Sequence, residues 1–412
     1  MSNITISPTK VTREIGNLLH NNMKFVSTIE RYYDPTTPGG QRDGGSIQLR
    51  IPPKYTTSTG PNLDVQDTTE QQVTLTRGTQ RHVDINFTTE ELTQDLDDFS
   101  SNVLAPAVNV LASVIDYDAM SMALEVYNSV GTYGTTPATA LVWLQANAKL
   151  SQFGVPTDMR NAALDPTANA STVDGLKGLF NPTTNVARQY VKGMMEAPAL
   201  GFEGWYMTQN VRKHTTGSGA ATSWQVDEPS GTNLVEGTRI LDMDGGSASE
   251  TMTVGDVFTI GSVYAVNPET KQSTGELMQF VVTNAATASS GQITGGTGTG
   301  QLQFSPAIYS SASGGLQNVD ALPADGAAVT VIGSASTAYP QNLAYHRDAF
   351  VLATADLIMP KGVDFAAREV LDGISIRLVR QYRIGNDDIP CRADVLYGYK
   401  TRRPEMACRV WG

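Results

Sequence analysis

The chain has 412 residues, enough for two or three domains, and its hydrophobic fraction of 40% is ordinary for a globular protein. Its net charge of -12 argues against a general nucleic-acid binder, because lysine and arginine supply the affinity for phosphates. Its two cysteines, Cys391 and Cys408, form no CxxC motif, so we expect buried thiols, a reducing compartment and no structural zinc site. No run approaches the roughly twenty apolar residues that span a bilayer, and the N-terminus lacks an apolar signal core, so we expect no membrane partner.

The first segments are predicted to form a helical arm followed by strands. Apolar residues recur at helical spacing near the N-terminus: Val11, Ile15, Leu18, Leu19, Phe25, Val26 and Ile29. From residue 39 the pattern changes to strict alternation, at residues 47–51, 73–75 and 83–87, which predicts strands. The polar, threonine-rich stretch 52–70 between the first two runs is too long for a tight turn. It predicts a long β-loop that stands off the body.

The longest helical signal runs from residue 88 to residue 130. Thr88 and Glu91 form a capping box at its start. An apolar stripe follows at steps of three, four or seven: Leu92, Leu96, Phe99, Val103, Val110, Val114 and Tyr117. We expect this stripe to pack on the subunit's own sheet and the acidic side of the helix to face outward. Pro106 predicts a kink or a break.

The middle of the chain divides into a mixed α+β body and an acidic β-rich stretch. Helices are predicted over 138–153, 173–180 and 184–195, within a body that ends at about residue 222. Residues 218–338 hold two basic residues against eleven acidic ones, a net charge of -9. Their apolar residues fall in short alternating runs between glycine-, serine- and threonine-rich turns. This pattern predicts an antiparallel β-barrel or sandwich inserted into the body, because the mixed texture resumes at residue 339.

No pattern in the sequence assembles into an active site. The four histidines, His20, His82, His214 and His346, are isolated in sequence and are interpreted as structural or surface residues. The glycine-rich stretch 295–300 lacks the Lys-Ser/Thr of a phosphate-binding loop, which favours a hairpin tip. We therefore predict no catalytic residues, no cofactor, no metal ion and no enzymatic activity.

Two charged stretches are candidate contact sites. Asp242, Asp244 and Glu250 surround a glycine pair, without the full spacing of a calcium loop. They form a solvated turn, a metal site or a charged contact with a neighbouring subunit. The arginines at 377, 380 and 383 lie among strand-forming residues, so ion pairs within or between subunits are favoured over a nucleic-acid groove.

Three stretches closely resemble the coat-protein family of short-tailed bacteriophages. They are GDVFTIGSVYAVNPETKQSTGELMQFVVTN (255–284), YPQNLAYHRDAFVLATADLIMPKGV (339–363) and SIRLVRQYRIGNDDIPCRADVLYGYKTRRPEMACRV (375–410), and GFEGWYMTQNVRKHTTG (201–217) is similar too. The resemblance implies an α+β fold of the Hong Kong 97 capsid type, interrupted by an inserted antiparallel β-barrel, the I-domain. The implied segments are an N-terminal arm (1–38), an E-loop (39–87), the spine helix of the peripheral domain (88–130), an axial domain in two parts (131–222 and 339–375), the I-domain (223–338) and C-terminal strands of the peripheral domain (376–412).

The function implied is that of a major capsid protein in a virion. Such a protein forms pentamers and hexamers and assembles in the host cytoplasm, with scaffolding protein and with a portal protein at one vertex. Its icosahedral shell encloses double-stranded DNA without sequence-specific binding. We hypothesise that Asp242, Asp244 and Glu250 contact a neighbouring subunit and that Asp95, Asp97 and Asp98 contact scaffold on the inner face. The alternatives are an encapsulin-like cellular nanocompartment protein and a β-rich adhesin or glycan-binding protein.

Overall fold

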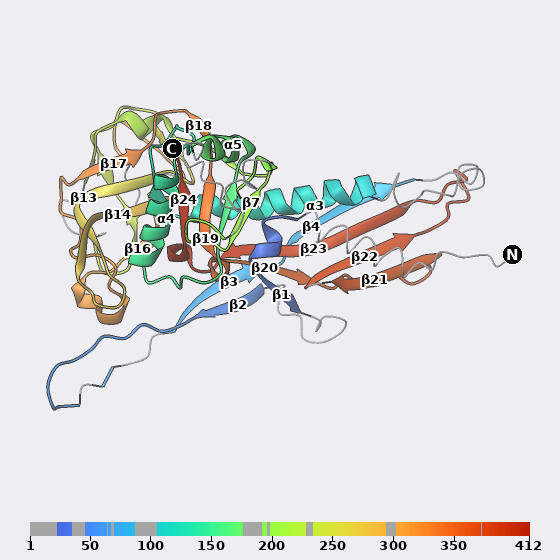
Figure 1. Ribbon diagram of the computed structural model, residues 1–412, viewed down its shortest axis with the longest axis horizontal. Helices are drawn as coiled ribbons and strands as arrows, with labels where there is room; N and C mark the ends of the chain where they lie inside the picture. The colour runs from blue at the N-terminus through green and yellow to red at the C-terminus, as the bar shows by residue number, and fades with distance from the viewer. Residues whose placement is uncertain are drawn as a thin grey trace. The chain divides into compact units, whose positions relative to one another are not determined.

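The computed structural model describes residues 23–34, 46–63, 65–66, 70–86, 105–175, 192–195, 198–227, 234–293, 302–371 and 373–412. Within these ranges the fold is mixed α+β, with many strands and few helices (Figure 1). The chain divides into two compact units. The first comprises residues 1–49, 72–120 and 350–402, and the second comprises residues 50–71, 121–349 and 403–412.

The first unit is built on a six-stranded sheet. Its strands follow the order β1-β20-β23-β22-β21, and β4 pairs with β23. The bounds are β1 Glu30–Asp34, β4 Thr79–Ile85, β20 Phe350–Ala355, β21 Phe365–Leu371, β22 Ile374–Arg380 and β23 Cys391–Thr401. Strand β1 runs parallel to β20, and the other pairs are antiparallel. The long strand β23 therefore pairs with three others.

Alternating strands lead into and out of the projecting loop, as the sequence predicts. Strands β2 (Ser46–Ile51) and β3 (Gln71–Thr76) form a two-stranded sheet at its base. Leu49 and Leu75 are buried against Val351 and Ala353 of β20. Burial of these apolar side chains anchors the hairpin foot to the sheet of the first unit.

The helix α3 (Ala105–Ala119) buries a different face from the one predicted. Its buried residues are Val108, Leu111, Ala112, Ile115, Asp116 and Ala119, whereas Val110 and Tyr117 are 60% and 42% exposed. The prediction that Val110 and Tyr117 pack on the sheet is therefore wrong. The helix has apolar residues on two faces, and the face that includes Asp116 is the buried one. The Asp116 carboxylate accepts hydrogen bonds from the backbone amides of Phe25 and Val26 at 2.9 and 3.0 Å, which stabilises it in the interior.

The helical arm is also corrected where it is described. A short 3-10 turn, η1 (Val26–Thr28), precedes β1, so Phe25, Val26 and Ile29 do not belong to an α-helix. The amides of Phe25 and Val26 donate to the side chain of Asp116, and the Thr28 amide donates to the Phe25 carbonyl within the turn. Parallel pairing of β1 with β20 then overrides the helical spacing of the sequence.

Pro106 is the second residue of α3 as described. Since residues 87–104 lie outside the described ranges, the predicted kink stays a prediction. The segment Pro106–Glu125 is long and apolar enough, by length and composition, to cross a membrane, which the sequence expectation had excluded. Half of it is buried in the fold, as in the core helix of a soluble protein, so this is weak support for a membrane span.

The second unit contains a five-stranded mixed sheet of order β5-β24-β19-β6-β7. The bounds are β5 Ser129–Val130, β6 Arg160–Leu164, β7 Gly204–Met207, β19 Asn342–His346 and β24 Ala407–Val410. Helix α4 (Ala140–Gln152) confirms the helix predicted over 138–153. Helix α5 (Pro166–Gly175) begins seven residues before the predicted Val173, because proline suits the first turn of a helix. Four short 3-10 turns complete this part: η3 Met120–Glu125, η5 Ser218–Ala221, η7 Arg347–Ala349 and η8 Pro404–Met406.

The predicted inserted β-structure is a seven-stranded antiparallel, barrel-like sheet of order β10-β16-β14-β13-β17-β9-β11. The bounds are β9 Trp224–Val226, β10 Thr238–Leu241, β11 Met243–Asp244, β13 Val257–Val266, β14 Ser273–Asn284, β16 Leu302–Ile308 and β17 Ala328–Ile332. Phe258, Phe280 and Phe304 meet in its core with ring centroids 5.3 to 5.9 Å apart. Two further pairs flank it: β8 (Lys213–Thr215) with β18 (Ala338–Pro340), and β12 (Thr251–Met252) with β15 (Ala286–Thr287).

Candidate assembly interface

The predicted acidic turn spans residues 242–250 of the barrel. Asp242 lies between β10 and β11, Asp244 ends β11, and Glu250 precedes β12, all three partly exposed. The Glu250 carboxylate accepts a hydrogen bond of 2.8 Å from the Ser247 amide, so it is engaged within its own turn. The Asp244 side chain makes no hydrogen bond or ion pair with another described residue. Of the three, Asp244 is therefore the carboxylate best placed to take an external partner.

This turn is fixed to the barrel core by close backbone approach. A Cβ atom at Gly246 would lie 2.2 Å from the ring of the buried Trp224, so only glycine fits there. The Gly246 amide also donates to the Gly291 carbonyl at 3.0 Å. The backbone that carries these acidic side chains is therefore fixed before any partner binds. Less conformational entropy is then lost when the turn makes a contact.

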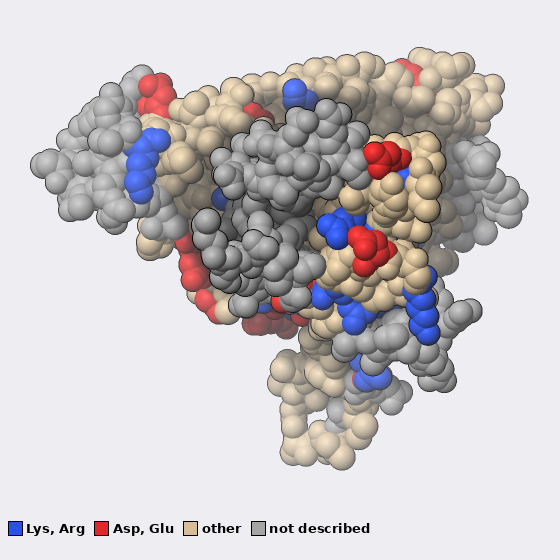
Figure 2. Space-filling model, turned by 90° about the vertical axis from the view of Figure 1, so that its right-hand side faces the viewer, with Lys and Arg blue, Asp and Glu red and all other residues tan. Residues whose placement is uncertain are grey.

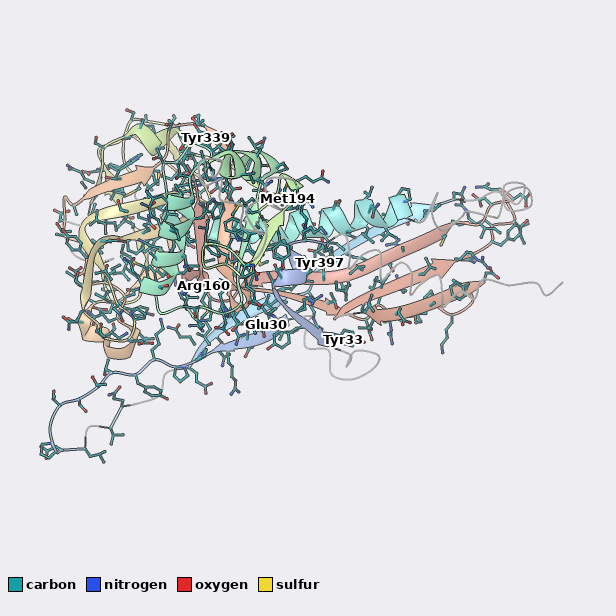
Figure 3. All side chains as sticks on the ribbon, in the orientation of Figure 1. Glu30, Tyr33, Arg160, Met194, Tyr339 and Tyr397 are labelled. Atoms are coloured by element: carbon teal, nitrogen blue, oxygen red, sulfur yellow. The ribbon has the colours of Figure 1, made fainter. Side chains whose placement is uncertain are left out.

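A buried contact between a histidine and a carboxylate joins the barrel to the strands that connect it to the rest of its unit. His214 of β8 lies opposite Tyr339 of β18, the residue marked in Figure 3. The Nε2 atom of His214 is 2.8 Å from Oδ1 of Asp256, and both side chains are almost fully buried. The Asp256 carboxylate accepts further hydrogen bonds from the amides of Gly217 and Thr253. His214 is therefore a buried residue that holds the fold together, which is one of the two roles predicted for it.

Arg409 of β24 is fully buried, with Asp256 nearby. It donates to the carbonyl oxygens of Gly255 and Leu124, each at 2.7 Å, and to the side chain of Gln341 at 3.3 Å. None of its partners among the described residues is a carboxylate, and burial lowers its pKa to about 10. One guanidinium therefore ties the last strand, the turn η3 and the barrel together.

The projecting loop carries exposed apolar side chains at its far end. Leu63 is 89% exposed and Val65 is 76% exposed. The two limbs are tied together by Gln66, whose Oε1 accepts the Thr56 amide at 2.9 Å and whose Nε2 donates to the Thr56 carbonyl at 2.5 Å. Exposed apolar groups on a tied loop are typical of a surface that packs on a partner.

The basic C-terminal strands of the first unit use their arginines in internal ion pairs. Arg377 binds Asp394 at 2.5 Å, and Arg380 binds Asp364 at 2.9 Å. Arg383 pairs with Asp388, which completes the set of three predicted arginines. The prediction of ion pairs is confirmed within the subunit. Figure 2 shows basic and acidic side chains next to one another near the right centre of the face in view.

Two further predictions concern cysteines and metals. Cys391 and Cys408 are free and buried, and burial raises their thiol pKa to about 11 and about 12, which confirms the predicted buried thiols. Within the described part of the chain, no three His, Cys, Asp or Glu side chains are grouped to hold a metal ion. The residues Asp95, Asp97, Asp98 and the glycine-rich stretch 295–300 lie outside the described ranges.

Comparison with known proteins defines the class of the molecule, which is that of bacteriophage coat proteins. The family model described as P22 coat protein - gene protein 5 matches residues 3–411. The chain belongs to the P22 coat protein family. Its function is that of a phage major capsid protein, a component of the icosahedral virion capsid. The predicted resemblance and α+β capsid fold are confirmed, and the cellular nanocompartment and adhesin alternatives are disfavoured.

Solved structures give distant similarities. The chain is similar to the structure titled Mycobacterium phage Che8, at 10% identity and a TM-score of 0.45 over 93% of this chain and 89% of that one. It is similar to the capsid of Cyanophage P-SCSP1u, at 10% identity and a TM-score of 0.44 over 94% and 88%. The CUS-3 coat protein I-domain is 26% identical over 27% of this chain and 97% of its own length, with a TM-score of 0.18. No curated protein matches the chain in sequence.

Proposed function

We propose that the protein assembles as pentamers and hexamers, with scaffolding protein, into an icosahedral procapsid and then a mature shell around double-stranded DNA. A portal protein occupies one vertex, assembly takes place in the host cytoplasm, and the protein acts without catalysis, cofactor or membrane. The observation that carries this proposal is the family match across residues 3–411. The net charge of -12 supports it, because an acidic shell does not trap the nucleic acid that it encloses.

We also propose the segment names of this family for the chain: N-terminal arm, E-loop, spine helix, two-part axial domain, I-domain and peripheral C-terminal strands. The barrel strands β9 to β17 support an I-domain at about 223–338. The boundaries of the two compact units differ from the boundaries of these segments. Residues 350–402 belong to the first unit and residues 403–412 to the second. The peripheral sheet would then include β20 and β21, and the last strand would belong with the axial part.

Electron microscopy of the purified protein, alone and with scaffolding protein, tests the assembly proposal. Closed shells of uniform diameter are expected when both proteins are mixed. A monomer that stays monomeric with scaffold present, at concentrations of tens of micromolar, would contradict it. Small-angle scattering on the same samples would follow the loss of free subunit.

The acidic turn is proposed to contact basic residues of a neighbouring subunit. Asp244 carries most of this proposal, because its side chain has no partner among the described residues, while Glu250 is engaged by Ser247. Neutralising Asp244 to asparagine should destabilise shells more than subunits. The matched control is Asp325→Asn, elsewhere on the barrel. If both shells and subunits of Asp244→Asn melted like the wild type, the contact would be excluded.

Two proposals concern residues around the predicted spine helix. Asp95, Asp97 and Asp98 are proposed to bind scaffold, on the basis of charge alone. Reversing their charge should abolish scaffold-directed assembly, and unchanged assembly would reject the contact. Pro106 is proposed as a bend that differs between pentamer and hexamer subunits, which a shell structure with identical helices in all subunits would refute.

A further inference from the structure

The barrel and the projecting loop touch through their backbones at one place. A Cβ atom built on Gly315 would lie 2.3 Å from the carbonyl oxygen and 2.9 Å from the carbonyl carbon of Lys54. Gly315 belongs to the 3-10 turn η6 (Ser311–Leu316) of the barrel, and Lys54 lies where the loop leaves strand β2. Both belong to the second compact unit, and Figure 1 shows the loop passing this turn. Because the neighbour is backbone, no side-chain rotation could make room for a larger residue.

The turn on the barrel side is unusually well held for an exposed segment. The carboxylate of Glu236 accepts hydrogen bonds from the Ser310 amide at 2.9 Å, from the Ser310 hydroxyl and from the Ser313 hydroxyl at 2.6 Å. At the other end, Lys271 Nζ donates to the carbonyl oxygens of Gly315 and Gln317 at 2.8 and 3.3 Å. Charged groups therefore clamp both ends of the segment 310–317. Hydrogen bonds to ionised groups are stronger than neutral ones, so the segment is a firm support.

The loop side is tied as well. Above the contact, Gln66 bonds to the backbone of Thr56 and joins the two limbs. Below it, Arg50 and Glu70 approach within 3.7 Å, an exposed pair that contributes little by itself. Lys54 lies between these two crosslinks. A displacement imposed at Lys54 is therefore carried to the tip as a change in direction of the whole loop.

We infer that the barrel segment 310–317 is a pad that supports the base of the projecting loop in the same subunit and sets the direction in which the loop points. This inference deepens the proposed function and rests on it in one respect, namely that the loop tip packs on a second copy of the chain. A supported loop needs less ordering when it docks, so the pad favours assembly by preorganisation. Through the pad, the inserted barrel would stabilise the loop of its own subunit. This role is separate from any contact that its acidic turn makes with a neighbouring subunit.

Hydrogen exchange on the unassembled, full-length protein tests the pad. In Gly315→Ala, the added methyl group must push the Lys54 backbone away. We expect the amide of Thr56, which donates to Gln66 across the loop, to exchange about tenfold faster, with the barrel core unchanged. The control is Gly261→Ala in β13, where the new Cβ atom meets nothing nearer than 3.4 Å. A Thr56 amide that exchanges at the wild-type rate in Gly315→Ala would overturn the inference.

A second variant covers the case in which Gly315→Ala does not fold. Glu236→Gln adds no volume but removes the charged acceptor of the pad. The amides of Ser313 and Gln317, which are hydrogen-bonded within the segment 310–317, and the amide of Thr56 should then exchange faster together. Faster exchange at Ser313 and Gln317 with no change at Thr56 would overturn the inference.

Assembly kinetics separate the pad from the proposed function. If Gly315→Ala loosens the loop and slows shell formation by about tenfold, the result supports both the pad and its role in assembly. If the loop loosens while shells form at the wild-type rate, the pad stands as an intramolecular contact and its role in assembly is rejected. If the wild-type protein forms no shells with scaffold, the proposed function fails, and the exchange result still decides the pad.

Discussion

Replacing Arg409 with methionine tests whether one buried guanidinium holds the last strand and the barrel together. Methionine keeps most of the apolar stem but removes every donor. The carbonyl oxygens of Gly255 and Leu124 and the side chain of Gln341 then lose their partner in the interior. Since Gly255 lies in the barrel, we expect the barrel to loosen from the final strand as well as a loss of global stability.

The magnitude follows from two opposing effects. Hydrogen bonds from a charged donor contribute about 1.5 to 3 kcal/mol each, so three contribute about 5 to 9 kcal/mol. Burial of the charge opposes this: the pKa of Arg409 falls from 12.5 to about 10, and one pKa unit corresponds to about 1.36 kcal/mol, so the cost is on the order of 3 kcal/mol. The difference predicts a destabilisation of about 2 to 6 kcal/mol in Arg409→Met.

Urea unfolding of the full-length subunit, followed by circular dichroism and tryptophan fluorescence, measures this change. Trp224 reports on the barrel and Trp143 on the body of the same unit, and both are fully buried. Arg239→Met, at an exposed arginine of the barrel, is the matched control and should leave the midpoint unchanged. An Arg409→Met protein as stable as the wild type would refute the reasoning, because the relief of charge burial would then equal the three hydrogen bonds.

Two further predictions concern the barrel and the five-stranded sheet. Gly246→Ala should lower the free energy of unfolding by about 1 to 3 kcal/mol in a thermal melt, because its methyl group would overlap the ring of Trp224; a melt like that of the wild type would show that the turn can move aside. Burial lowers the pKa of His346 below its ordinary value of 6.5 and outweighs the nearby carboxylates, so the unfolded chain binds the proton more strongly. Stability should therefore be complete above about pH 6.5 and decline as the pH falls below it, and a urea midpoint for His346→Gln as pH-dependent as that of the wild type would contradict this assignment.

The sequence predicts most of the strands because their residues alternate along the chain. Strands β2, β3 and β4 and the barrel strands β13 and β17 lie where alternating apolar residues indicate them. Alternation of apolar and polar residues is a local property, so a strand can be predicted from it even when the partner strand is not known. The insertion is also visible in composition, since its glycine, serine and acid content differs from that of the flanking chain.

Features that depend on distant partners could not be predicted in this way. The buried face of α3 is decided by Asp116, whose partners lie about ninety residues away at Phe25 and Val26. His214 is isolated in sequence, and its carboxylate partner Asp256 is 42 residues further on. Arg409 belongs to a basic segment, and nothing local separates this buried arginine from its exposed neighbours.

Local signals for two of these features are present but weak. The tyrosines in the strand ERYYD favour β-structure over the helix that the preceding spacing suggests. A lone acid within the apolar half of a helix, such as Asp116, indicates either a solvent-facing site or a buried acceptor. Only the fold distinguishes these two readings, since both satisfy the helical pattern.

The position of β24 has a consequence for the order of events during synthesis. Strand β24 lies between β5 and β19 in the five-stranded sheet, so residues 407–410 join segments that are made much earlier. While the ribosome still holds these residues, β5 has no neighbour and the sheet is divided. The strands of the inserted barrel lie within residues 224–332 and can pair earlier, but the barrel core also takes in Trp411, which follows β24. The long sequence separation between β24 and its partner strands therefore favours late completion of both the sheet and the barrel core.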